Sequence, residues 1–188
     1  MTAMRLFVAI DFPETVKDQL DTLQVPIPTA RWVKRQQMHL TLFFLGETDR
    51  LQDIKAALAG VVSQPFELTL TGTGRFPKRQ KQPPRVLWIR IDPEPALNQL
   101  HVQVTTALAG IGFQPEDRPF SPHITLARLK ARERLPEVDT FLDTHAAFRV
   151  TSIPVTEFVL FSSVLSSQGA RYERLDSFVL SDRADKIG

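Results

Sequence analysis

The tetrapeptide His39-Leu40-Thr41-Leu42 recurs later in the chain as His123-Ile124-Thr125-Leu126. Successive side chains of a strand point to opposite faces, so each copy, read as a strand, carries His and Thr on one face. The aliphatic residues then enter a core. Two copies facing each other would surround one space with two imidazoles and two hydroxyls. This set suits a phosphate, because hydroxyls bond its oxygens while one imidazole removes a proton and the other delivers one.

The sequence that precedes each motif is repeated too. Leu6–Asp11 is an apolar, strand-like run that ends in Asp, and a helical pattern separates it from the first motif. Val86–Asp92 has the same relation to the second motif. Two copies of a long unit do not make a solenoid. We therefore expect one domain over residues 1–188, built from two lobes at approximately 1–80 and 81–180 around a pseudo-two-fold axis, with a polar tail at 183–188.

Hydrophobic periodicity predicts a mixture of strands and helices. The expected strands lie at about 4–11, 38–45, 66–74, 85–92, 121–129, 153–163 and 170–180. The expected helices lie at about 14–23, 50–63, 94–110 and 135–145. A turn over residues 166–169 should join the last two strands.

Composition narrows the class of protein. The chain has 188 residues, 43% of them hydrophobic, which is enough for a substantial core, and it has no stretch apolar enough to span a membrane. It has no cysteine, so disulfides, thiolate nucleophiles and thiolate metal sites are excluded. The first residues lead into a strand without the pattern of a secretion signal. We expect a cytoplasmic protein without a membrane partner.

The net charge of +2 is a mild basic excess, but its distribution is uneven. The segment 74–85 reads as an exposed loop between two strands and contains Phe76. It holds a cluster of basic residues, namely Arg75, Lys78, Arg79, Lys81 and Arg85. If the loop overhangs the His/Thr space, its charges would attract a polyanion and Phe76 could stack on a base. A loop that is merely solvated stays open as the alternative.

These features resemble the 2H phosphoesterases. Both motifs, the opening strand Arg5–Asp11, the block His39–Gly46, the strand Pro84–Trp88 and the segment Arg118–Arg128 carry the resemblance, which covers nearly the whole chain. Within that superfamily the chain resembles the bacterial and archaeal RNA 2′,3′-cyclic phosphodiesterases, historically called 2′-5′ RNA ligases (ThpR/LigT type).

The resemblance implies a bilobal α+β fold, with antiparallel sheets flanking a central cleft and helices outside. It implies metal-independent opening of a 2′,3′-cyclic phosphate at an RNA end to a 2′-phosphate, without a cofactor. The same groups run backwards would join such an end to a 5′-hydroxyl end. The expected partner is RNA with this terminus, tRNA fragments included, and the protein is expected to act as a monomer.

The motif residues can be given provisional roles. An imidazole with an ordinary pKa of about 6.5 holds either protonation state near neutral pH, so one copy can act as base and the other as acid. We assign His123 as the base that activates water and His39 as the acid that protonates the departing 3′-oxygen. The near symmetry leaves the opposite assignment open. Thr41 and Thr125 are assigned to bind the phosphate.

Further substrate contacts are expected beside the motifs. The family implies a substrate-binding arginine at Arg128, although strict alternation would put it on the face opposite His123 unless the strand ends or bulges before it. Arg118 and Phe120 immediately precede the second motif and are candidates for the cleft rim. Phe76 is the candidate from the basic loop.

Three alternatives remain. Two His with carboxylates such as Asp11 and Asp92 could bind zinc, but a catalytic zinc needs three protein ligands and the motifs offer no third, so no metal site is expected. A non-catalytic RNA-binding module would use the same residues only as phosphate contacts. Another 2H activity, such as hydrolysis of a cyclic ADP-ribose phosphate or trimming of an RNA end, would share the motifs and differ in the cleft wall.

Overall fold

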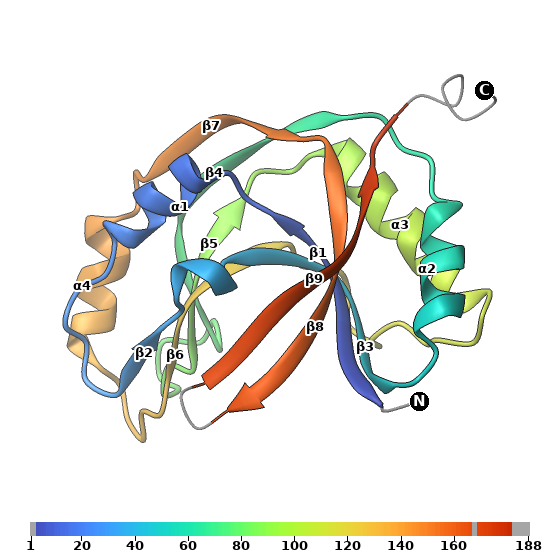
Figure 1. Ribbon diagram of the computed structural model, residues 1–188. Coiled ribbons are helices and arrows are strands. Elements are labelled where there is room, and N and C mark those ends of the chain that lie inside the picture. Colours follow the sequence, from blue (N-terminus) through green and yellow to red (C-terminus); the bar gives the residue numbers. More distant parts are fainter. Residues whose placement is uncertain (1–2, 167–168, 182–188) are drawn as a thin grey trace.

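A single antiparallel sheet with helices outside it forms the computed structural model, which describes residues 3–166 and 169–181 (Figure 1). The strands are β1 (Met4–Asp11), β2 (Ala30–Trp32), β3 (His39–Thr48), β4 (Phe66–Phe76), β5 (Val86–Ile91), β6 (His123–Leu129), β7 (Arg149–Val155), β8 (Glu157–Ser166) and β9 (Gly169–Val179). The helices are α1 (Glu14–Asp21), the 3-10 turn η1 (Arg35–Gln37), α2 (Leu51–Ala59), α3 (Pro95–Ala109) and α4 (Pro136–Thr144). The α+β fold that the resemblance implies is confirmed.

Local sequence explains the helices well. In α3, Pro95 occupies the first turn, where a missing N–H costs nothing, and the Glu94 carboxylate accepts a bond from the Ala96 N–H at 3.0 Å. The apolar stripe of this helix is buried and consists of Leu97, Leu100, Val104 and Leu108. All four predicted α-helices are present. Helix α2 ends at Ala59, earlier than expected, with Gly60 as its C-cap.

The strand expected at 153–163 is wrong, because two strands occupy this region. β7 ends at Val155 and pairs with β4, whereas β8 begins at Glu157 and pairs with β1. One residue, Thr156, separates them, although β7 is an edge strand and β8 lies next to the opposite edge strand, β9. The short strand β2 was not predicted, and the expected polar tail and part of the expected turn at 166–169 lie outside the described residues.

The strand order does not follow a boundary near residue 80. The strand order is β7-β4-β5-β6-β3-β1-β8-β9, with β2 paired to β6 beside this path. Thus β4, from the first half of the sequence, joins β5 and β6, while β8 and β9, from the second half, join β1 and β3. Each lobe is completed by strands from the other half of the chain, because hydrogen bonding between edges, and not sequence order, closes each half of the sheet.

One ladder pair joins the two halves of the sheet. β3 and β6 are antiparallel neighbours, and their ladder contains the single pair Leu40 and Ile124, both fully buried. The main core lies on the side of the sheet to which these two residues point. Outside it, α2 and α3 lie side by side, while α4 packs near β4 (Figure 1). No helix in the described part of the chain is long and apolar enough to cross a membrane.

Candidate active site

The β3–β6 junction brings the two motifs together. Because Leu40 and Ile124 point into the core, the neighbouring His and Thr of each strand point to the opposite, concave face. One step to either side of this antiparallel pair, His39 comes beside Thr125, and Thr41 comes beside His123. Directly opposite residues lie about 4.5–5.5 Å apart between Cα atoms. The pseudo-two-fold relation between the motifs therefore runs through the Leu40–Ile124 pair.

Each imidazole is held by the same hydrogen bond. Nδ1 of His39 bonds the backbone carbonyl of Gln37 at 2.6 Å, and Nδ1 of His123 bonds that of Ser121 at 2.7 Å. A carbonyl only accepts, so Nδ1 carries the proton in both rings and Nε2 is the atom left for proton transfer. Nε2 of His39 lies 3.0 Å from the hydroxyl of Thr41. The duplicated bond aims both Nε2 atoms away from the backbone that holds them.

The surroundings of His39 depress its proton affinity. Its ring centroid lies 4.9 Å from that of Phe7, 5.4 Å from Tyr172 and 6.5 Å from Phe161. Burial among these rings lowers the pKa of His39 to about 4, against the Gln37 carbonyl and the Asp11 carboxylate, which act to raise it. The charges of Arg128 and His123 also lower it. His39 is therefore neutral near pH 7 in the free protein.

Two aromatic residues other than those around His39 lie beside His123. The ring of Phe76 lies 5.3 Å from the imidazole in an edge-on arrangement, and that of Trp88 lies 6.2 Å from it. The indole of Trp88 packs against Gly74 so closely that an added Cβ would come within 2.2 Å of the ring. Only glycine allows this packing. Phe76 is the last residue of β4, and its ring contacts His123 of the second motif. It therefore lies beside the motif residues and not at the tip of the basic loop.

A β-bulge decides the position of Arg128. In the β5–β6 ladder Trp88 pairs with Thr125 and Leu87 pairs with Ala127, so Leu126 is an extra residue. The bulge shifts the alternation by one position. Leu126 and Ala127 are both buried, and Arg128 emerges exposed on the face of His123 and Thr125. The strand therefore bulges before Arg128, which is the condition under which this arginine shares the face of His123.

The first motif strand has the same irregularity. In the β1–β3 ladder Ala9 pairs with Thr41 and Val8 pairs with Phe43, so Leu42 is extra. Phe44 therefore emerges on the face of His39 and Thr41, 42% exposed. The Arg5 guanidinium lies over its ring at 5.1 Å. Phe44 thus occupies, in the first lobe, the position that Arg128 occupies in the second.

Comparison with known proteins agrees with this geometry. A model of the 2′-5′ RNA ligase superfamily matches residues 12–163, most of the chain. The chain belongs to this superfamily. The resemblance drawn from the motif residues is confirmed.

Two relatives match this chain over almost their whole length. An RNA 2′,3′-cyclic phosphodiesterase of Archaeoglobus fulgidus is 32% identical, covering 93% of this chain and 99% of the relative. One from Thermotoga maritima is 34% identical, covering 92% and 93%. The crystal structure of Escherichia coli LigT complexed with 3′-AMP has a TM-score of 0.74 at 30% identity, covering 96% of this chain and 99% of that chain.

Arg118 and Phe120, which were expected at the cleft rim, make their contacts with other parts of the protein. Arg118 has a side chain that is 84% exposed and forms an ion pair with Glu116 at 3.2 Å. The ring of Phe120 stacks on His101 of α3 at 3.8 Å. Phe120 thus packs on α3, whereas Ser121 of the same segment contacts His123 through its backbone carbonyl.

The basic loop is only partly as expected. Arg75 is not an exposed charge but is buried, 5% exposed, because it shares a face with the core residue Leu87 of the neighbouring strand. Its guanidinium donates to the carbonyls of Pro77 (3.1 Å) and Gln82, and so fixes the loop. Lys78, Arg79, Lys81 and Arg85 remain available at the surface.

The carboxylates of the zinc alternative are already engaged. Asp11 pairs with Lys17 at 2.7 Å and with Arg174 at 3.0 Å. Asp92 accepts a bond from the Thr71 hydroxyl at 2.6 Å and pairs with Arg149 at 3.6 Å. Among the described residues, no group of three His, Cys, Asp or Glu side chains could hold a metal ion.

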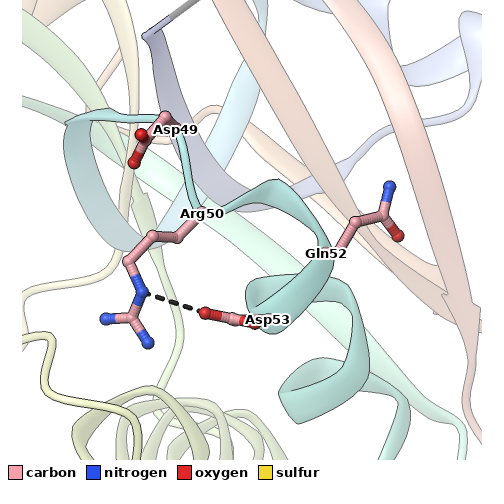
Figure 2. Close-up of a pocket in the computed structure, with 4 residues that line it drawn as sticks. All are labelled: Asp49, Arg50, Gln52 and Asp53. Atoms are coloured by element: carbon pink, nitrogen blue, oxygen red, sulfur yellow. Dashed lines mark hydrogen bonds and ion pairs between the residues drawn. The ribbon is translucent and has the colours of Figure 1, made fainter. Parts of the chain in front are cut away.

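A shallow pocket elsewhere on the molecule does not contribute to this site. It lies at the start of α2 and is lined by Asp49, Arg50, Gln52 and Asp53 (Figure 2). The guanidinium of Arg50 bonds Asp53 at 3.0 Å and the carbonyl of Ile111 at 2.8 Å, so the pocket surrounds a contact that ties α2 to the end of α3. It follows the end of β3 opposite to His39, roughly 30 Å away at the rise of an extended strand.

Proposed function

We propose that this protein hydrolyses 2′,3′-cyclic phosphate ends of RNA to 2′-phosphates, using only its own side chains. The observation that carries the proposal is the pair of imidazoles, each fixed at Nδ1 by a carbonyl two residues earlier, on facing strands with a threonine hydroxyl beside each. The relatives named above as RNA 2′,3′-cyclic phosphodiesterases support the substrate.

In the proposed reaction His123 acts as the base. Its Nε2 takes a proton from water, and the water oxygen attacks phosphorus. The bond from phosphorus to the 3′-oxygen breaks, and His39 gives its Nε2 proton to that oxygen, which leaves the phosphate on the 2′-oxygen. The hydroxyls of Thr41 and Thr125 donate to the non-bridging oxygens, where charge increases in the transition state.

The acid role requires that His39 gain a proton that it lacks in the free protein. Its pKa of about 4 leaves the ring neutral near pH 7. An anionic cyclic phosphate beside Nε2 favours the imidazolium, so substrate binding is proposed to raise the pKa of His39. In the opposite assignment, His39 would be the base from the start.

A substrate with sulfur in place of the 3′-oxygen separates the two assignments. A thiolate leaves without protonation, so the variant that lacks the acid should regain turnover, whereas the variant that lacks the base should not. The proposal expects recovery of His39→Ala and not of His123→Ala. Recovery of His123→Ala alone would reverse the roles.

Metal independence has its own test. Hydrolysis of an oligoribonucleotide ending in 2′,3′-cyclic phosphate, followed by identification of the product terminus, should proceed at an unchanged rate in excess chelator. Loss of activity that is restored by added zinc or manganese would contradict the mechanism.

The assembly, the substrate contacts, the natural substrate and the location of the protein are also proposed here. The chain is proposed to act as one domain and as a monomer, since it supplies both motifs itself. Arg128 and Phe76 are proposed as substrate contacts because both reach the motif face. tRNA fragments with a cyclic end are proposed as natural substrates, in the cytoplasm, and joining to a 5′-hydroxyl end is the same chemistry in reverse.

A further inference from the structure

Two arginines face each other beside the site. Arg31, at the centre of β2, pairs directly with Arg128 of β6, and both are exposed. Directly paired residues of neighbouring strands share one face of the sheet. The bulge at Leu126 has already placed Arg128 on the face of His123 and Thr125, so Arg31 lies on that face too.

The neighbours of Arg31 fix this orientation independently. Trp32 packs edge-on against Phe141 of α4, with ring centroids 5.7 Å apart, and its indole N–H donates to the carbonyl of Val25 at 3.1 Å. Ala30 and Trp32 both pack against the main core. Alternation along β2 therefore sends Arg31 to the opposite, concave face.

The pairing is electrostatically unfavourable in the free protein. Like charges directly opposite on adjacent strands repel each other. Among the residues that the structure describes, no carboxylate forms an ion pair with either arginine, whereas Arg35 pairs with Glu14 and Arg174 pairs with Asp11. A repulsive pair left at the edge of a site is compensated when an anion binds between the two guanidiniums.

The position suits an anion that is connected to the reacting phosphate. Along β6, Arg128 lies less than about 10 Å from Thr125 at the rise of a strand. Its charge acts on both His39 and Tyr172, so it borders the place where the cyclic phosphate would sit. Arg31 lies one strand further out, over β2.

We propose that Arg31 and Arg128 together bind a backbone phosphate of RNA upstream of the cyclic end, and that this pair makes the protein prefer oligoribonucleotides to cyclic mononucleotides. The inference rests on the proposed function and deepens it. The planar guanidinium donates two parallel N–H groups to a phosphate, and two arginines can bind the same phosphate from both sides. A cyclic mononucleotide has no such phosphate.

The test compares two substrates, a cyclic mononucleotide and an oligoribonucleotide with a 2′,3′-cyclic end, across salt concentrations. Arg31→Gln should raise KM for the oligoribonucleotide about 10-fold, the effect of losing one charge-assisted contact. It should flatten the salt dependence of oligoribonucleotide binding by roughly 0.7 in log–log slope. KM for the mononucleotide should stay within about 2-fold, and Arg31→Lys should recover part of the loss.

Lys55→Gln is the matched control. It removes the same charge from α2, where Lys55 pairs with Asp176 at 3.2 Å, and should change neither KM. A stability measurement separates binding from a structural role: Arg31→Gln should leave Tm unchanged or raise it, because it removes a repulsion.

Equal effects of Arg31→Gln on the two substrates, or none on either, would overturn the inference. A marked fall in Tm with the loss would do the same, since it would show a structural role. If the wild-type protein hydrolyses neither substrate, the proposed function fails. Direct binding of the oligoribonucleotide to wild type and Arg31→Gln then still decides the inference: a weaker variant supports it and equal affinities overturn it.

Discussion

Around His39 the imidazole meets three aromatic rings from β1, β8 and β9, whereas around His123 it meets two, from β4 and β5. Both rings keep the same bond from Nδ1 to a carbonyl two residues earlier. The duplicated strand thus fixes the direction of each imidazole. The aromatic rings around each imidazole form its wall, and different strands supply the two walls. The wall of His39 buries the ring and lowers its pKa to about 4. The direction of the imidazole is repeated, whereas its surroundings are not.

The largest expected effect comes from removing either imidazole. His39→Ala and His123→Ala should each lower kcat by about 10²–10⁴-fold, the usual contribution of a positioned acid or base. The double variant should be little worse than either single variant, because the pair acts as one unit. Single-turnover kinetics on a cyclic-phosphate oligoribonucleotide measures this. Near wild-type turnover in either single variant would refute the two-histidine mechanism.

The threonines should matter less and should test the symmetry. Thr41→Ala and Thr125→Ala each remove a phosphate donor and leave both imidazoles in place, so each should cost about 10–1,000-fold in rate. Thr41 also bonds Nε2 of His39, and its loss should additionally move the pH–rate profile. Serine at either position keeps the hydroxyl and is the matched control. A profile that moves equally in both variants would show that the lobes do not differ here.

The pH dependence of stability measures how far the surroundings of His39 lower its pKa. Its pKa of about 4 in the folded protein lies below the ordinary value of 6.5, so between these values the unfolded chain binds more protons. The free energy of unfolding should therefore fall as pH falls from about 6.5 to about 4, by about 2–3 kcal/mol. Urea unfolding across this range should show that His39→Asn lessens the fall, while His123→Asn keeps it because His39 is still present. Parallel curves for wild type and His39→Asn would contradict this.

The wall of His123 has a smaller, steric test. Gly74→Ala puts a methyl group within 2.2 Å of the Trp88 ring and should destabilise the protein by about 1–3 kcal/mol, with a lower kcat as the ring shifts beside His123. Adding Trp88→Leu should recover part of both losses. Gly60→Ala, whose Cβ would meet its nearest atom at 3.4 Å, is the control and should change stability by about 0.5 kcal/mol or less. The measurements are thermal unfolding and kcat of the wild type, Gly74→Ala, the double variant and Gly60→Ala. A Gly74→Ala variant as stable and active as the Gly60→Ala control would contradict the prediction.

The sequence was sufficient for the helices and for the faces of the motif strands. Periods of 3.6 and 2 are local properties, and they were enough to place α3 and to separate His39 and Thr41 from the core residue Leu40. The recurrence of the motif was enough to expect that both copies would share one site. Phe76 was also selected from the sequence, for its place in a basic loop, and its ring lies 5.3 Å from the His123 imidazole.

Tertiary structure decided what depends on the partner strand. The extra residues Leu42 and Leu126 are bulges only relative to β1 and β5, and they bring Phe44 and Arg128 to the motif face against simple alternation. The arginine pair across β2 and β6 is likewise a matter of register. So is the exchange of strands between lobes.

The physical reason is the same in each case. Alternation and helical period are properties of one segment and can be read from its own residues. Register, bulges and strand order are set by hydrogen bonds between segments far apart in the chain. By itself the sequence determined which side chains could do the chemistry, and only the folded sheet decided which others face them, how deeply His39 is enclosed, and where Arg31 lies.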